Sequence, residues 1–208
     1  VEDSLRALDT DYLDILLLHR PDALVEPEEV ARAFDELEAA GKVGAFGVSN
    51  HTPSQIELLK TAVRQPIVAN QVQLSIAHAP LVAQGVAANM QGLAQSAVLD
   101  GGGLVDYARI NGITLQAWSP MQAPGWKLFL GSPDYPELNA EIDRLAEAYG
   151  VEPIAIATAW ITRHPAGMQV VLGTTNPSRV AAAVAGSDLP LTRAEWYGLL
   201  RAAGYLIP

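Results

Sequence analysis

Polar and aromatic side chains recur at the ends of short apolar segments in this sequence. An imidazole in such a place is a candidate catalytic group, and hydroxyl and amide groups suit a planar heterocycle that bears a carboxamide. A flat indole can stack on such a ring. The backbone N–H groups that open the predicted helix 176–185, together with Arg179, are expected to bind phosphate. The side chains with these capacities are His19, Ser49, Asn50, Gln71, Trp118, Ser119, Thr174 and Arg179.

Five short apolar segments carry these side chains, and helical patterns separate them without any hairpin signal. This alternation predicts βα units and a parallel sheet. The carboxyl ends of parallel strands meet at one edge, where α/β folds place their chemistry. We therefore expect the candidate side chains to lie at one edge, although each taken singly has a plain structural explanation. The predicted strands are residues 13–18, 43–48, 67–72, 113–118 and 170–172.

The strongest strand signal is the segment 12–22, YLDILLLHRPD. Its nearly unbroken apolar run is typical of a strand buried on both faces in a parallel sheet. Pro21 cannot donate to a ladder, so the strand should end near His19. The imidazole is then expected at the carboxyl tip of a buried strand.

Several helix ends are recognisable between these strands. Thr52 with Gln55 and Thr192 with Glu195 form capping-box patterns, and Asn176 before Pro177 is typical of a helix start. Residues 79–103 have no sharp period, and we expect a long excursion with some helix there. The other predicted helices are residues 1–8, 28–40, 52–63, 104–110, 138–149, 153–161, 176–185 and a last one after Thr192.

Composition excludes several classes of function. Thirteen basic against twenty-three acidic residues give a net charge of −10, which disfavours nucleic-acid binding. The chain has no cysteine, so a disulfide framework and a thiolate metal site are excluded, and a reducing, cytoplasmic location fits. No apolar run reaches the roughly 18 residues of a membrane span, so no membrane partner is expected. The 208 residues suit a single domain, 1–208.

Five stretches resemble, in order and at plausible spacings, the strand-end motifs of the aldo-keto reductases: YLDILLLHRPD, GKVGAFGVSNHTPSQIELL, IVANQVQLS, LQAWSPM and VVLGTTNPSRV. The resemblance is closest to bacterial members with the HRPD motif. It implies an eight-stranded α/β barrel that reduces aldehydes and ketones with NADPH and without a metal. In this alignment the chain begins just before the fourth strand. The expected fold is therefore α/β, a partial (β/α)8 TIM barrel of strands four to eight whose first three strands are missing, and the Val1 start inside a helical pattern suggests a fragment.

The resemblance also implies roles around the nicotinamide. His19 matches the histidine of the catalytic tetrad, which orients the substrate carbonyl. Ser49, Asn50 and Gln71 match the side chains that hold the nicotinamide carboxamide. Trp118 matches the aromatic residue that stacks on the nicotinamide ring.

Further matches lie around the phosphates of the cofactor. Ser119 and Met121 occupy the loop that contacts the pyrophosphate in the family. Thr174 and Arg179 match groups around the adenosine 2′-phosphate, where Gly173 replaces a lysine that many members use. NADPH is thus favoured over NADH through Arg179.

The aspartate, tyrosine and lysine of the tetrad have no match in this sequence. We therefore expect the chain alone to be inactive, whereas a full-length protein would act on a small-molecule carbonyl substrate. The resemblance implies a monomer at full length, and association of the shorter chain through its exposed strand edges is expected.

Two other functions remain open from the sequence. A non-catalytic reductase-like subunit would keep the nucleotide site as a sensor without turnover. An unrelated phosphate-binding barrel, such as an isomerase, would use only the last loop and has no use for Ser49, Asn50, Gln71 and Trp118 together. The physiological carbonyl substrate does not follow from the sequence.

Overall fold

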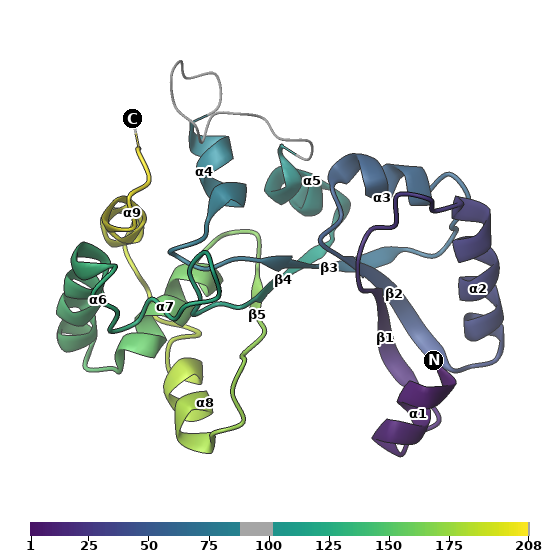
Figure 1. Ribbon diagram of the computed structural model, residues 1–208, viewed down its shortest axis with the longest axis horizontal. Coiled ribbons are helices and arrows are strands. Elements are labelled where there is room, and N and C mark those ends of the chain that lie inside the picture. Colours follow the sequence, from purple (N-terminus) through teal and green to yellow (C-terminus); the bar gives the residue numbers. More distant parts are fainter. Residues whose placement is uncertain (88–101, 208) are drawn as a thin grey trace.

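The computed structural model describes residues 1–87 and 102–207, which build one sheet of five parallel strands in sequence order (Figure 1). The first strand lies at one edge and the fifth at the other. Because all the pairings are parallel, the carboxyl ends of the strands share one edge of the sheet. The strands are β1 Leu13–Leu18, β2 Val43–Ser49, β3 Ile67–Gln73, β4 Thr114–Trp118 and β5 Gln169–Val170.

Helices connect these strands, and the capping patterns expected at three of them are confirmed. The two capping boxes and the Asn176 cap all form with their side-chain hydrogen bonds. The helices are α1 Glu2–Leu8, α2 Pro27–Ala39, α3 Pro53–Leu59, α4 Pro80–Val86, α5 Leu104–Asn111, α6 Pro136–Tyr149, α7 Pro153–Thr162, α8 Pro177–Val184 and α9 Arg193–Ala202.

One face of the sheet is packed and the other is partly exposed. In β3 the side chains of Asn70 and Val72 are buried, whereas the intervening Gln71 is half-buried. The buried side chains pack with those of the connecting helices, for example in the stacked pair Phe34 and Phe46, whose ring centroids lie 3.9 Å apart. Alternation along each strand therefore leaves a polar row on the open face.

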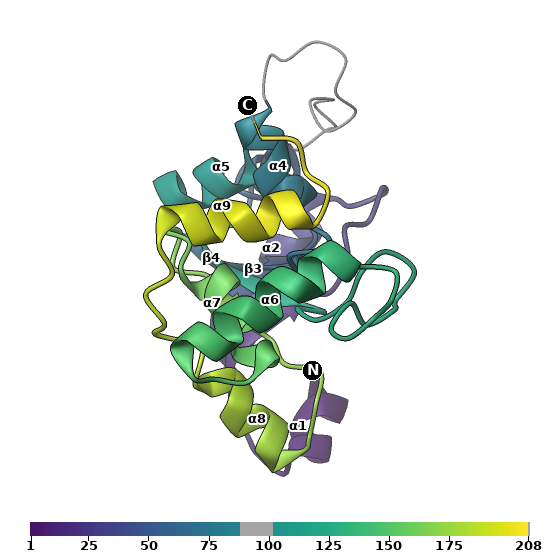
Figure 2. The same cartoon turned by 90° about the vertical axis from the view of Figure 1, so that its left-hand side faces the viewer.

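The left-hand part of the molecule is a group of helices. In Figure 2, α6 and α9 lie toward the viewer with α7 beside them and α8 below. Contacts join α7 to α6 and to α8, and α6 to α9. This group closes the end of the sheet that carries β5.

The expected partial barrel is corrected by this architecture. The described residues form an open five-stranded sheet whose edge strands β1 and β5 do not pair with each other. The expectation that the first strand is buried on both faces is also wrong, because the side chains of the edge strand β1 remain partly exposed. Ile15 is 44% exposed, and the leucines of β1 are only half-buried.

Element boundaries differ from expectation at three places. The helix expected to reach residue 63 ends at Leu59 and continues in turns, and the fifth strand is Gln169–Val170 rather than 170–172. In the long connection expected at 79–103, α4 occupies Pro80–Val86, while residues 88–101 lie outside the described part of the chain.

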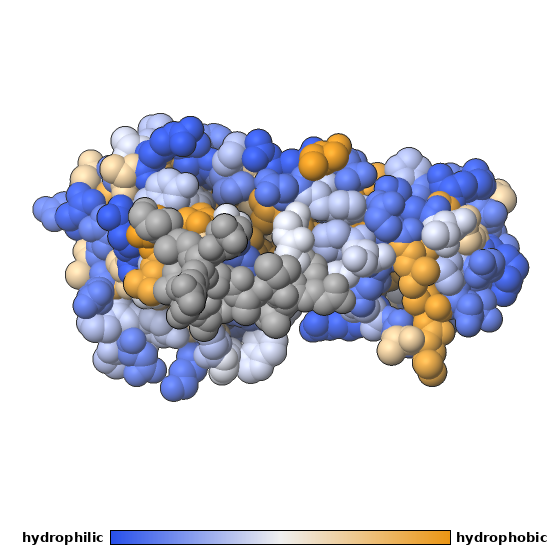
Figure 3. Space-filling view, turned by 90° about the horizontal axis from the view of Figure 1, so that it is seen from above, coloured by the Kyte–Doolittle hydropathy of each residue, from blue (hydrophilic) through white to orange (hydrophobic). Residues whose placement is uncertain are grey.

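Seen from above, the surface is mainly hydrophilic (Figure 3). An apolar strip crosses the right-hand part of this face, the end of the molecule that holds α2 and α3. Within residues 1–87 and 102–207, no helix has the length and apolar character needed to cross a membrane.

Replacing Gly47 by alanine should destabilise the fold. A Cβ atom there would lie 2.5 Å from Leu17 Cδ2 and 2.7 Å from the backbone oxygen of Ala69, so β2 could no longer sit between its neighbours. We expect a loss of about 1–3 kcal/mol in the free energy of unfolding, measured with urea. Gly85→Ala in α4, where no described atom outside its own stretch of helix lies within 4 Å of the new Cβ, is the control and should retain or gain stability.

Candidate active site

A row of polar side chains crosses four strands on the open face of the sheet. The register pairs Ser49 with Gln71, Gln71 with Gln116, and Gln116 with Gln169. The Nε2 of Gln71 donates to Oε1 of Gln116 over 3.1 Å, and the Nε2 of Gln116 donates to Oε1 of Gln169 over 2.9 Å. Sequence reasoning missed Gln116 and Gln169, because their place in this row depends on the register between strands.

A second set of hydrogen bonds joins the predicted residues at the ends of β2 and β4. The hydroxyl of Ser49 donates to the backbone oxygen of Gln71 over 2.8 Å, and Nδ2 of Asn50 donates to Oγ of Ser49 over 2.8 Å. The indole Nε1 of Trp118 donates to Oδ1 of Asn50 over 3.1 Å. The structure thus brings Ser49, Asn50, Gln71 and Trp118 together, as the sequence predicted for one edge of the sheet.

The backbone at this edge is held in unusual conformations. Asn50 and Ser119, at the ends of β2 and β4, have φ values of 57° and 52°, in the left-handed region. Asparagine tolerates this region, whereas serine adopts it rarely. The fully buried Asn70 donates to the backbone oxygen of His51 over 2.8 Å and accepts from its N–H over 3.4 Å, which ties the turn after β2 to β3.

His51 is a buried residue of this turn that sequence reasoning did not single out. Its Nδ1 lies 2.9 Å from the backbone oxygen of Ser49, so the ring is joined to the end of β2. Burial lowers the pKa of His51, and the nearby Ser49 carbonyl opposes that shift only in part. The neutral ring therefore supports the turn that presents Asn50.

Two groups in this cluster keep hydrogen-bonding capacity. The Nδ2 of Asn50 has a second N–H, and Oε1 of Gln71 accepts no hydrogen bond from the described residues. One donor and one acceptor match the oxygen and the NH₂ of a primary carboxamide. The Gln71–Gln116 bond holds the amide of Gln71 with its oxygen available.

Trp118 is packed by two side chains from other segments. The ring of Trp126 stacks on it with centroids 5.7 Å apart, and the guanidinium carbon of Arg20 lies 5.7 Å from its centroid. Trp126 has a φ of 65° and is 63% exposed. A second planar ring that stacks on Trp118 would compete with whichever of Trp126 and Arg20 lies over the same face of the indole.

His19 lies directly after β1 and is exposed. It forms no hydrogen bond with the residues that the structure describes. The neighbouring Arg20 reaches Trp118, so the segment after β1 borders the cluster formed by Ser49, Asn50, Gln71 and Trp118. His19 has the position at a strand end that the sequence predicted, on the edge strand.

The predicted phosphate-binding residues lie after β4 and β5. Ser119 follows β4 directly, and the half-buried Met121 packs against the hydrophobic core. Gly173 and Thr174 follow β5 and precede α8, with Thr174 accepting from the N–H of Asn176 over 3.2 Å.

The prediction that the start of α8 binds an anion through its backbone N–H groups is wrong. Oδ1 of Asn176 accepts the N–H groups of Ser178 and Arg179, over 2.9 and 3.2 Å, so these donors are already used as a helix cap. Pro177 has no N–H. The exposed Arg179 forms no ion pair within residues 1–87 and 102–207, and its guanidinium is the remaining anion-binding group there.

No group of three or more histidine, cysteine or acidic side chains that could hold a metal ion occurs in the described part of the chain. The cluster at the ends of β2, β3 and β4 is built from amides, a hydroxyl and an indole. Such groups can bind and orient a planar polar ring by hydrogen bonding and stacking.

The unfolding free energy should fall as the pH is lowered from about 7.5 to about 5. Burial lowers the pKa of His51, His78 and His164 below the unfolded value of about 6.5, so the unfolded chain takes up protons first. The contribution of these histidines to the free energy of unfolding is therefore fully present above about pH 6.5 and is lost as the pH falls below it. Urea titrations across this range would measure the change, and His51→Gln should show a smaller decline. Stability that stays constant or rises on acidification would contradict the prediction.

A family model described as "Aldo/keto reductase family" matches residues 1–199. A 6-dehydroglucose reductase of Agrobacterium fabrum is 36% identical over 199 residues, covering 96% of this chain and 60% of that protein. The oxidoreductase YdhF of Escherichia coli is 36% identical over 210 residues, covering 100% of this chain and 63% of that protein. An aldo/keto reductase from Klebsiella pneumoniae, solved with NADP and acetate, superimposes with a TM-score of 0.75 at 25% identity, covering 100% of this chain and 64% of that one.

These matches take in nearly the whole chain, beginning at its first residue. In place of the expected partial barrel of strands four to eight, the chain is described by its own open sheet of five parallel strands. The chain spans 60% and 63% of the length of the two curated relatives. The resemblance inferred from the five motifs is confirmed at the level of the family: this chain belongs to the aldo/keto reductases.

Proposed function

We propose that the full-length protein reduces the carbonyl group of a small-molecule aldehyde or ketone with NADPH in the cytoplasm. The observation that carries this proposal is the hydrogen-bonded cluster of Ser49, Asn50, Gln71 and Trp118 at the strand ends, which offers one donor and one acceptor beside an indole. The relatives named as oxidoreductases and reductases, and the Klebsiella structure with NADP, support the same reaction class and cofactor.

The chain's own part in the reaction is to hold and orient. The free N–H of Asn50 would donate to the carboxamide oxygen of the nicotinamide, and Oε1 of Gln71 would accept from its NH₂. Trp118, whose plane is set by its bond to Asn50, would support one face of the ring. The bound cofactor supplies the hydride, and the chain determines which face of the ring is exposed to the substrate.

His19 is proposed to position the substrate. It is exposed at the end of β1, on the segment that borders Trp118 through Arg20. An imidazole N–H there would donate to the carbonyl oxygen and hold it next to the nicotinamide as negative charge develops. His19 is the tetrad member that the sequence matches.

Arg179 is proposed to bind the adenosine 2′-phosphate, with Thr174 and the backbone at Gly173 beside it. Because Asn176 occupies the nearby backbone donors, the guanidinium carries the recognition of this phosphate. Ser119 and Met121 are proposed to border the pyrophosphate after β4.

A non-catalytic nucleotide-binding subunit is the second candidate function. Three tyrosines have raised pKa values, and burial is the main cause at each: Tyr107 and Tyr149 also bond to glutamates, and Tyr205 is packed inside. None of these three suits a proton donor whose pKa is lowered by a neighbouring lysine. This feature favours binding without turnover.

Asn50→Ala should weaken NADP⁺ binding by about tenfold, because it removes the donor to the carboxamide and the acceptor that orients Trp118. Quenching of tryptophan fluorescence or calorimetry would measure it. Asn111→Ala, at an exposed amide at the end of α5, is the control and should bind as the unaltered chain does. Equal affinity of Asn50→Ala and the control would exclude the proposed carboxamide site.

Arg179→Gln should reduce the preference for NADPH over NADH by about tenfold or more, because a charge-assisted contact to the 2′-phosphate is lost. The two dissociation constants, measured on the same preparation, give the ratio. Arg32→Gln, on the exposed side of α2, serves as the control for net charge. A ratio that is unchanged in Arg179→Gln would place the 2′-phosphate elsewhere.

Oxidation of NADPH by a simple aldehyde separates the two functions. The expectation that the 208 residues alone are inactive remains a prediction, based on the single matched tetrad residue. Dinucleotide binding without turnover, in protein of verified mass, would agree with it. Steady turnover abolished by His19→Ala would establish the reductase and contradict the expected inactivity. Absence of both binding and turnover would refute the proposed function.

A further inference from the structure

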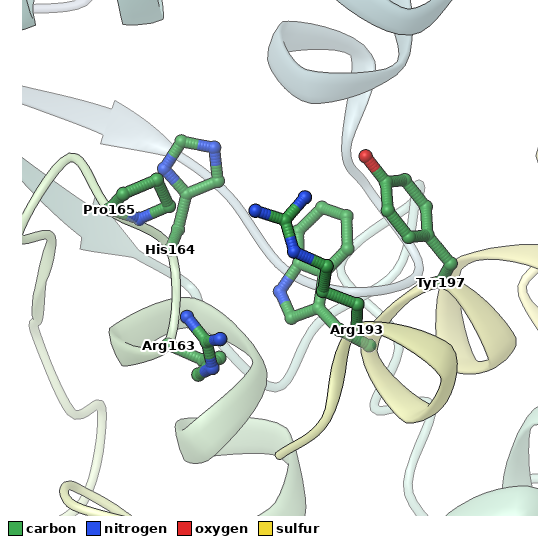
Figure 4. Close-up of a pocket in the computed structure, with 6 residues that line it drawn as sticks. Arg163, His164, Pro165, Arg193 and Tyr197 are labelled. Atoms are coloured by element: carbon green, nitrogen blue, oxygen red, sulfur yellow. The ribbon is translucent and has the colours of Figure 1, made fainter. Parts of the chain in front are cut away.

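A pocket of about 220 Å³ lies between the end of α7 and the first turns of α9. It belongs to the opposite edge of the sheet from the candidate active site, because residues 163–165 precede β5 whereas the cluster around Asn50 follows the strands. Its lining residues are Arg163, His164, Pro165, Arg193, Trp196 and Tyr197 (Figure 4).

The pocket is cationic in a chain of net charge −10. Arg163 and Arg193 form no ion pair with any residue in the described ranges, whereas Arg64 and Arg144 each contact carboxylates. The acidic residue nearest in the sequence, Glu195, uses its carboxylate to cap α9 and to accept from Tyr149. These two guanidinium groups therefore have no ion-pair partner among the residues that the structure describes.

The walls of the pocket are held rigidly. Nε of Arg163 donates to the backbone oxygen of Leu191 over 2.8 Å, which fixes the direction of its guanidinium. Trp160 and Trp196 stack with centroids 5.0 Å apart, and each indole N–H donates to the other's backbone oxygen, over 3.1 and 2.8 Å. These reciprocal bonds fix α9 against α7. A ligand would therefore lose little binding free energy to the ordering of the pocket walls.

The histidine of the pocket is oriented as a donor. Nδ1 of His164 accepts from the N–H of Ala166 over 3.2 Å, so the ring proton of the neutral form is on Nε2. Figure 4 shows the imidazole and the guanidinium groups of Arg163 and Arg193 around the same space, with Tyr197 on the other side. The cavity next to it, of about 180 Å³, shares His164 and carries Asp106 together with Arg109, whose charges offset each other.

We propose that this pocket binds a small organic anion, a phosphate or carboxylate group on a single planar ring. The oxyanion would be held by the guanidinium groups of Arg163 and Arg193 and by Nε2–H of His164. The ring would lie against Trp196 and Tyr197, which meet edge to face at 5.0 Å. A volume of about 220 Å³ suits one aromatic ring with its anionic group and is too small for a whole dinucleotide.

Calorimetric titration of the 208-residue chain with phenyl phosphate, benzoate and inorganic phosphate tests this proposal. We expect saturable binding of at least one aryl anion, about tenfold tighter than inorganic phosphate, because only the aryl anions contact the aromatic wall. Comparing the affinities for phenyl phosphate and benzoate then shows whether the pocket prefers a phosphate or a carboxylate group. Saturating NADP⁺ should leave the affinity unchanged, so the result is independent of the proposed function.

Variants locate the binding. Arg193→Gln and Arg163→Gln should each weaken aryl-anion binding about tenfold, whereas Arg201→Gln, on the same helix but outside the pocket, should leave it within twofold. The side chain of Arg193 makes no hydrogen bond within the described ranges, so its variant should keep the unaltered melting temperature even if Arg163→Gln is less stable. The proposal would be overturned by an absence of saturable binding or by equal affinity for inorganic phosphate. Displacement by NADP⁺, or equal weakening by Arg201→Gln, would overturn it as well.

Discussion

The parallel register of β2, β3, β4 and β5 is the constraint on which the candidate active site depends. It aligns Ser49, Gln71, Gln116 and Gln169 in one row, and their amides then bond in series across the strands. A shift of one residue in any pairing would turn a member of the row to the packed face, where its amide would be buried among apolar side chains. The register therefore decides both which groups face the ligand and how the amides are oriented.

The packed face of the sheet makes this polar row possible. Buried side chains such as Phe46, Val48 and Leu115 hold the strands against their helices, while a buried Asn70 joins the turn after β2 to β3. A buried amide that is fully bonded adds rigidity at the point where Asn50 takes a left-handed conformation. Apolar packing thus supplies the stability, and a few buried polar groups supply the exact position of the strand ends.

The two edges of the sheet present different chemistry. The carboxyl ends gather neutral amides, a hydroxyl and an indole, with the guanidinium of Arg20 over the indole. The opposite edge, beside α7 and α9, gathers two guanidinium groups, which form no ion pair with the described residues, against the hydrogen-bonded pair Trp160 and Trp196. Because the connecting helices run back between these edges, an α/β chain of this length can hold two separate binding surfaces.

The sequence by itself determined the order of the elements, most strand positions, the helix caps and the family, because apolar period and capping chemistry are local and the five motifs are specific. It also predicted that Ser49, Asn50, Gln71 and Trp118 lie together. Only the tertiary structure decided that β1 is a half-exposed edge strand, that the sheet is open, and that Asn176 occupies the backbone donors expected to bind phosphate. Gln116, Gln169 and the Arg163–Arg193 pocket likewise appear only in three dimensions, since register and helix packing join residues that no local pattern connects.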